Sequence, residues 1–209
     1  YASLIAIRQD NLRKLVAYSS IAHIGLMCAA VFSETQSGMQ GAMIQMFSHG
    51  INIIGLWVVV GILERQFGTR KISELGGLAQ KAPAMAMLFV IVALANIALP
   101  LTNAFPGEFL MFNGVFNSVG SRFPLLLTVL AGTSIVLAAV YTLNMIRKVF
   151  YGQANELTST VTDLGLAEKL ALGVIVALIF VFGVYPQALL NVTSEVSDFI
   201  LTQANVLKK

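Results

Sequence analysis

The sequence is poor in charged residues and in chemically reactive side chains. Only 11% of its 209 residues are Asp, Glu, Lys or Arg, against roughly 25% in an ordinary soluble domain. It has two histidines and one cysteine, Cys28, which we expect to be a small buried hydrophobic residue. One cysteine excludes an intramolecular disulfide, and no Cys/His cluster is spaced to hold a metal. The net charge of +3 is too small and too scattered to indicate nucleic-acid binding.

Motifs for substrate chemistry are also lacking. The sequence has no glycine-rich phosphate cradle between a strand and a helix, and no Ser/His/Asp arrangement for nucleophilic catalysis. We therefore expect neither a catalytic centre nor a bound cofactor or metal in this chain.

Apolar residues are abundant instead, at 57% of the chain, and the mean hydropathy is +0.81. A soluble protein could not cover so much apolar surface with polar residues, so lipid is its natural solvent. Four apolar runs are long enough to cross a membrane as helices: residues 15–32, 39–63, 125–146 and 166–192. This pattern predicts an all-α, polytopic transmembrane helix bundle.

Residues 82–119 form a further apolar segment that is too long for one straight crossing. A helix of that length would measure about 57 Å, nearly twice the hydrocarbon thickness. Its middle carries Pro100, Pro106 and Gly107, which interrupt helices. We predict one discontinuous crossing, with a half-helix to about Leu99 and a second from about Pro106, which makes about five crossings in all. Irregular backbone at membrane depth is tolerated only inside protein or beside a wet cavity, so this break indicates a functional site.

The distribution of Lys and Arg predicts the orientation. Alternating crossings place ten of the 13 basic residues on one side and three, Arg122, Lys208 and Lys209, on the other. The positive-inside rule makes the first side cytoplasmic. Residues 1–209 are expected to form a single membrane domain, a C-terminal fragment of a longer chain, because the sequence opens on Tyr1 in what looks like the end of an earlier helix. Residues 194–209 are expected to form a short interfacial amphipathic tail.

Three ionisable residues lie at membrane depth in the predicted crossings. His23 and His49 lie about 15 and 21 Å from the cytoplasmic ends of their predicted helices, and Glu108 lies about 17 Å from the outer end of its half-helix, so all three lie near the midplane. Such groups are costly in lipid and usually line a functional pathway. The predicted supporting polar residues are Ser19, Ser20, Gln45, Asn52, Thr102 and Asn103. Histidine both accepts and donates a proton, so the set predicts a proton pathway through water and side chains.

Structural explanations compete with this one. Either histidine can simply bond a neighbouring helix, and the polar residues together can lock helices into a scaffold. Glu108 would fall near the third helical position if Pro106 is the first, where a carboxylate caps the helix and favours its dipole.

Three motifs carry a resemblance to a known family. They are residues 12–25 (LRKLVAYSSIAHIG), residues 45–50 (QMFSHG) and residues 98–110 (ALPLTNAFPGEFL). In this order and at these separations they resemble the antiporter-like proton-pumping membrane subunits of respiratory complex I, and the resemblance covers essentially the whole chain. The glutamate in the broken helix resembles the chain M, or subunit 4, type.

The resemblance implies redox-driven proton translocation as a subunit of NADH–quinone oxidoreductase, with His23, His49 and Glu108 on a central hydrophilic axis. It implies that NADH, FMN, iron–sulfur clusters and quinone are bound by partner subunits of the complex. The implied location is the bacterial inner (plasma) membrane, or the mitochondrial inner membrane. Two related alternatives stay open: a chain of a multisubunit sodium/proton antiporter, and the membrane arm of an energy-converting hydrogenase.

Overall fold

The computed structural model describes residues 1–118 and 120–207, and within this part the chain is all-α. Val119, Lys208 and Lys209, which fall in the predicted broken crossing and tail, lie outside the described residues. Three short 3₁₀ helices, η1 (Ile72–Glu74), η2 (Leu78–Gln80) and η3 (Thr158–Thr160), lie in the connecting loops. The α-helices are α1 (Ala2–Ile7), α2 (Leu12–Val31), α3 (Gln36–Phe67), α4 (Pro83–Asn96), α5 (Ala104–Phe116), α6 (Pro124–Val149), α7 (Leu166–Val184) and α8 (Gln187–Leu207).

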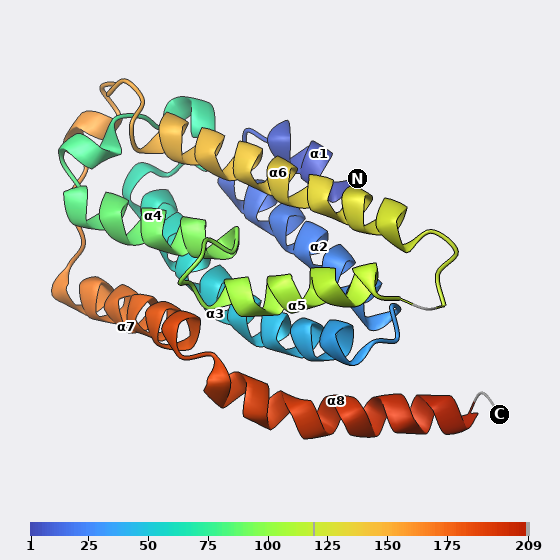
Figure 1. Ribbon diagram of the computed structural model, residues 1–209. Coiled ribbons are helices and arrows are strands. Elements are labelled where there is room, and N and C mark those ends of the chain that lie inside the picture. Colours follow the sequence, from blue (N-terminus) through green and yellow to red (C-terminus); the bar gives the residue numbers. More distant parts are fainter. Residues whose placement is uncertain (119, 208–209) are drawn as a thin grey trace.

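Five crossings are confirmed, one of them discontinuous. By length and composition, α2, α3, α6 and α7 are each able to cross a membrane, and α4 is a shorter apolar helix. Figure 1 shows α5 continuing in the general direction of α4, with an unwound segment between them. Their 14 and 13 residues together give about 40 Å of helix, enough for one crossing made of two halves.

The break between the half-helices is wider than expected and displaced towards the N-terminus. α4 ends at Asn96 rather than Leu99, and α5 begins at Ala104 rather than Pro106. Ala98 and Leu101 adopt left-handed backbone angles, with φ of 54° and 73°, which no α-helix tolerates. Pro106 still fits inside α5 because the first backbone N–H groups of a helix have no partner within it.

The last crossing is shorter than predicted. The expected single helix over residues 166–192 is wrong, because α7 ends at Val184 and α8 begins at Gln187. Pro186 disfavours a helical conformation at Tyr185, which has φ −122° and ψ 69°. The helix that contains the predicted tail, α8, therefore begins at Gln187, seven residues before the predicted start at Ser194, and the interfacial position of the tail remains a prediction. Its first turn is tied to α3 by Gln40 Nε2, which donates to the Leu190 carbonyl at 2.9 Å.

Glycines let α3 and α5 approach each other backbone to backbone. A Cβ on Gly114 of α5 would lie 2.3 Å from Gly38 Cα, and one on Gly41 would lie 2.6 Å from Met111 N. Small residues at such crossings permit close packing of membrane helices. The second half of the broken crossing is thereby held directly against α3.

Cys28 is exposed on α2 and is not the buried residue we expected. The inward face of α2 carries Ser19, His23, Leu26 and Ala30, all of them buried at helical spacing. Cys28 points away from that face.

The predicted basic residues gather at one end of the bundle, which we call the basic end: the α1–α2, α3–α4 and α6–α7 connections with the helix ends next to them. Arg13 pairs with Glu64 at 2.6 Å, Arg70 also pairs with Glu64, and Lys81 donates to the Ser159 carbonyl at 2.6 Å. Arg122 lies in the α5–α6 turn at the opposite end. The predicted grouping is therefore confirmed for the described residues, whereas the assignment of this end to the cytoplasm remains a prediction.

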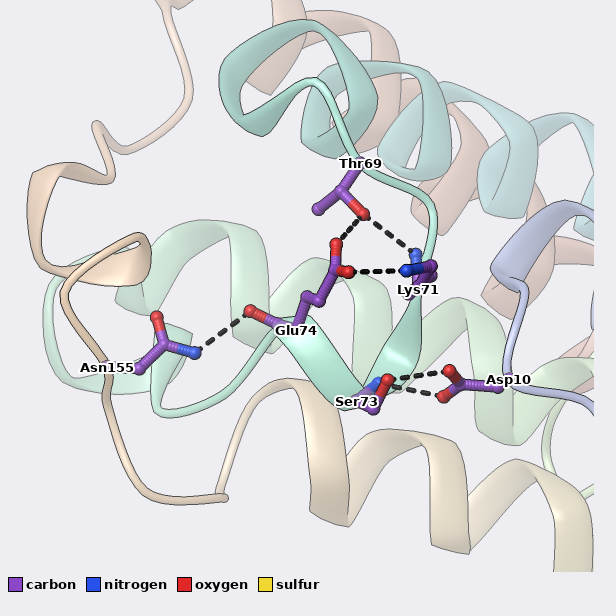
Figure 2. A network of polar contacts seen from close by, with 6 residues as sticks. All are labelled: Asp10, Thr69, Lys71, Ser73, Glu74 and Asn155. Atoms are coloured by element: carbon purple, nitrogen blue, oxygen red, sulfur yellow. Dashed lines mark hydrogen bonds and ion pairs between the residues drawn. The ribbon is translucent and has the colours of Figure 1, made fainter.

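Figure 2 shows how polar contacts join these connections. Asp10 accepts from the Ser73 N–H at 2.8 Å and from the Ser73 hydroxyl at 2.6 Å, and Asn155 Nδ2 donates to the Glu74 carbonyl at 2.9 Å. The Lys71 ammonium lies 2.8 Å from the Glu74 carboxylate. Hydrogen bonds from Lys71 and Thr69 lower the pKa of Glu74, and the bond to Glu74 raises the pKa of Lys71. The Lys71–Glu74 pair therefore stays charged at neutral pH.

Candidate functional site

The two histidines meet inside the bundle. His23 of α2 and His49 of α3 are buried, and their ring centroids lie 5.1 Å apart with the planes tilted by 43°. Both rings therefore face the interior of the bundle. Neighbouring residues on both helices continue the polar character, since Ser19 precedes His23 by four positions and Asn52 follows His49 by three.

Asn96, the last residue of α4, joins the first half of the broken crossing to this pair. Its Nδ2 donates to Ser19 Oγ at 3.2 Å and lies 3.5 Å from His23 Nε2. Tyr141 of α6 donates its hydroxyl proton to the same Ser19 Oγ at 3.0 Å. Ser19 thus connects three helices next to His23.

The break is fastened to α3 one residue before His49. Ser48 Oγ donates to the Asn103 carbonyl at 2.8 Å, and Asn103 Nδ2 donates to the Ser48 carbonyl at 3.2 Å. This reciprocal pair fixes where α5 begins and hence where Glu108 lies.

Glu108 lies at the fifth position of α5, beyond the first turn, because the helix begins at Ala104. The capping role that we considered for it is therefore wrong: a carboxylate caps from the first turn, and α5 has no acidic residue there. Glu108 is buried, and in the described part of the chain it has neither a hydrogen bond nor an ion pair. It faces a cavity of about 10 Å³ that it shares with His23, Ser134 and Tyr141.

Several buried polar atoms around the two histidines have no protein partner in the described residues. Gln45 lies against α5, since a Cβ on Gly107 would be 3.0 Å from Gln45 Oε1. A buried polar group without a partner is costly unless water reaches it. The unpartnered atoms at the site are Gln45 Oε1, His49 Nδ1, Asn52 Nδ2 and Oδ1, Asn96 Oδ1 and Asn103 Oδ1.

Residues 1–135 match the family described as "NADH:quinone oxidoreductase/Mrp antiporter, TM". The chain belongs to this family. In sequence it is 37% identical, over its full length, to NADH-quinone oxidoreductase subunit M of Rickettsia bellii, and it spans 40% of that relative.

Two solved structures share this fold. The chain superposes with a TM-score of 0.85 on a chain of respiratory complex I from Thermus thermophilus with bound NADH, at 30% identity, covering 95% of this chain and 42% of that one. It also superposes with a TM-score of 0.83 on the Mrp complex from Dietzia sp., at 16% identity, covering 94% of this chain and 44% of that one. The second likeness shows the fold alone.

The predicted site residues divide into two groups. The structure brings Ser19, His23, Gln45, His49, Asn52, Asn103 and Glu108 to the α2, α3 and α5 faces that meet inside the bundle. Ser20 instead donates to its own helix at the Val16 carbonyl, and Thr102 donates to the Leu99 carbonyl within the break. Pro100 lies in the unwound segment, and Gly107 packs against Gln45.

Sequence reasoning missed three contributors, Asn96, Ser48 and Tyr141. Asn96 is the one amide in an otherwise apolar stretch of α4, and this isolated position was a signal that could have found it. Tyr141 and Ser48 gave no comparable signal, because a tyrosine in an apolar helix and a serine on a packing face are common in membrane proteins.

Proposed function

We propose that this chain carries part of the proton pathway in the membrane arm of an NADH–quinone oxidoreductase. His23, His49 and Glu108 exchange protons through water held between α2, α3, α5 and α6, while other subunits bind NADH, FMN, iron–sulfur clusters and quinone. Oxidation of NADH elsewhere in the complex would drive the transfer.

One observation carries this proposal: a buried carboxylate without an ionic partner shares a cavity with one of two touching histidines at a helix break. Buried charges that serve structure are paired. An unpaired glutamate that can load a proton, beside rings that both accept and donate, is suited to relay protons.

The sequence identity to M-type relatives favours complex I over the two alternatives. The likeness to the Mrp complex is a likeness of fold, which related assemblies share. By the same reasoning the partners are other membrane-arm subunits, and the location is a bacterial plasma membrane or its mitochondrial counterpart.

The test uses the full-length subunit in its assembled complex, reconstituted into vesicles, with NADH-driven proton uptake measured beside the amount of complex assembled. Glu108→Gln keeps the size of the side chain but cannot release a proton, so uptake should fall roughly tenfold or more while assembly is retained. Glu108→Asp should keep part of the activity. The matched control is Glu156→Gln, which neutralises an exposed carboxylate in the α6–α7 loop.

Normal uptake in the Glu108→Gln complex would refute the relay. Loss of the assembled complex in that variant, but not in Glu156→Gln, would favour a scaffold role.

A further inference from the structure

Tyr141 is a buried hydroxyl that the pathway proposed above does not use. Its side chain is 2% exposed, and its hydroxyl is held by Ser19 beside His23. Three separate cavities, each of about 10 Å³, are lined by this one residue. That volume is about the smallest that admits a single water molecule.

The three cavities follow one another along α6. The first is the Glu108 cavity, which His23 and Ser134 also line. The second lies between Ser19, Asn96, Thr142 and apolar residues. The third reaches the basic end and is lined by Gln9, Asn144 and Lys148. The first and third cavities have several polar groups in their walls, as a bound water requires, whereas the wall of the second is mainly apolar.

The positions on α6 explain this order. Ser134, Ala138, Tyr141, Met145 and Lys148 recur every three or four residues, so they form one stripe along the helix. From Tyr141 to Lys148 the helix rises by about 10 Å. Lys148 is exposed, so the stripe runs from the interior to the surface of the basic end.

We propose that the Tyr141 hydroxyl is a relay that connects the Glu108–His23 cavity to the basic end through single waters in the first and third of these cavities. This inference rests on the proposed function. It adds that protons enter or leave the pathway at the basic end of the bundle. The hydroxyl accepts a proton on its oxygen from one neighbouring water and releases its own to the next acceptor, so the tyrosine is neutral before and after each transfer.

Ser19 orients this relay. Its oxygen accepts hydrogen bonds from Tyr141 and from Asn96. These two bonds occupy both acceptor sites of the oxygen and leave the Ser19 O–H free to donate.

The test is Tyr141→Phe in the reconstituted complex, with proton uptake measured in H₂O and in D₂O. Removing the hydroxyl keeps the ring and its packing, and uptake should fall about tenfold. Proton delivery then limits turnover, so the ratio of the H₂O rate to the D₂O rate should rise above that of the unmodified complex. Tyr18→Phe is the matched control, because Tyr18 lies on α2 outside all three cavities.

The other outcomes overturn the relay. Reduced uptake with an unchanged isotope ratio, or loss of assembly in Tyr141→Phe but not in Tyr18→Phe, would make the hydroxyl a structural link between α6 and α2. Normal uptake in Tyr141→Phe, with uptake lost in Glu108→Gln, would remove Tyr141 from the pathway and leave the proposed function intact. Normal uptake in both variants would refute the proposed function itself.

Discussion

The interior of the bundle and its basic end satisfy their polar groups in different ways. At the basic end, Asp10 accepts two hydrogen bonds from Ser73, and Asp163 accepts from the N–H groups of Ala84 and Met85 at 3.0 Å each. In the interior, Glu108 has no partner among the described residues.

This difference distinguishes polar groups that hold the structure together from polar groups that serve the proposed function. The carboxylates of Asp10 and Asp163, which only hold segments together, are bonded to protein partners, because an open hydrogen-bonding site is costly. Interior groups with open sites keep their capacity to bind water and exchange protons. Substitutions at the basic end should therefore change stability with little effect on translocation, and interior substitutions should do the reverse.

The largest effect is expected for His49→Gln. Glutamine retains hydrogen-bonding groups but cannot take up a proton near neutral pH. Proton uptake by the assembled complex should therefore fall on the order of tenfold or more. The thermal unfolding midpoint in detergent should change little, because the His49 Nδ1 atom has no hydrogen-bond partner among the described residues. If uptake stayed normal while the midpoint dropped sharply, the interior would behave like the basic end, and the comparison would fail.

A stability effect without a functional one is expected for Asp163→Ala. The carboxylate caps the N-terminus of α4, so its loss should cost about 1–2 kcal/mol, seen as a lower unfolding midpoint at pH 7. Proton uptake at a temperature where the complex is folded should be unchanged. A loss of uptake as large as that of His49→Gln would contradict the assignment of this residue to structure alone.

The same carboxylate gives a pH test. Burial alone would raise the pKa of Asp163, but the backbone N–H groups of Leu164, Met85 and Ala84 outweigh it and hold the pKa below its usual range. Because the folded pKa is the lower one, the stabilisation is complete above the unfolded value of about 4 and is lost as the pH falls through the folded value. Unfolding midpoints measured from pH 7 to pH 3 should show this loss in the unmodified chain. In Asp163→Ala that contribution should be missing.

The smallest effect is expected for Asp10→Ala, which removes the two hydrogen bonds from Ser73 at an exposed site (Figure 2). Exposed hydrogen bonds contribute about 0.5–1 kcal/mol, and translocation should be unaffected. Ser73→Ala and the double variant complete a cycle in which the two single effects should not add. Additive effects would show that the pair contributes nothing to the basic end.

Sequence patterns predicted the crossings better than their ends. Apolar length was enough for α2, α3 and α6, and the prolines with Gly107 located the break. Helix ends depend on backbone bonds that sequence reasoning did not resolve. Pro106 marked the start of α5 only to within two residues because proline is acceptable throughout the first turn, and Pro186, which ends the last crossing, was taken to be tolerated inside it.

The site was predictable where a residue is anomalous for its surroundings. A histidine or glutamate in an apolar helix is such an anomaly, so His23, His49 and Glu108 were found. Tyr141 is not, because its ring belongs in an apolar helix and only the tertiary contact with Ser19 reveals what its hydroxyl does. Sequence reasoning also could not exclude a capping role for Glu108, because that role depends on where α5 begins.

Gly183 brings the last crossing against the break in the discontinuous crossing. Most of α7 faces outward, with only Leu172 and Ile179 fully buried among its described side chains. Yet a Cβ at position 183 would lie 2.1 Å from the carbonyl oxygen of Leu101 in the break. Every residue except glycine would therefore push the break or the last crossing out of place. The outward face of α7 accepts almost any apolar residue. Position 183 accepts only glycine, because the backbone some eighty residues earlier in the chain lies against it.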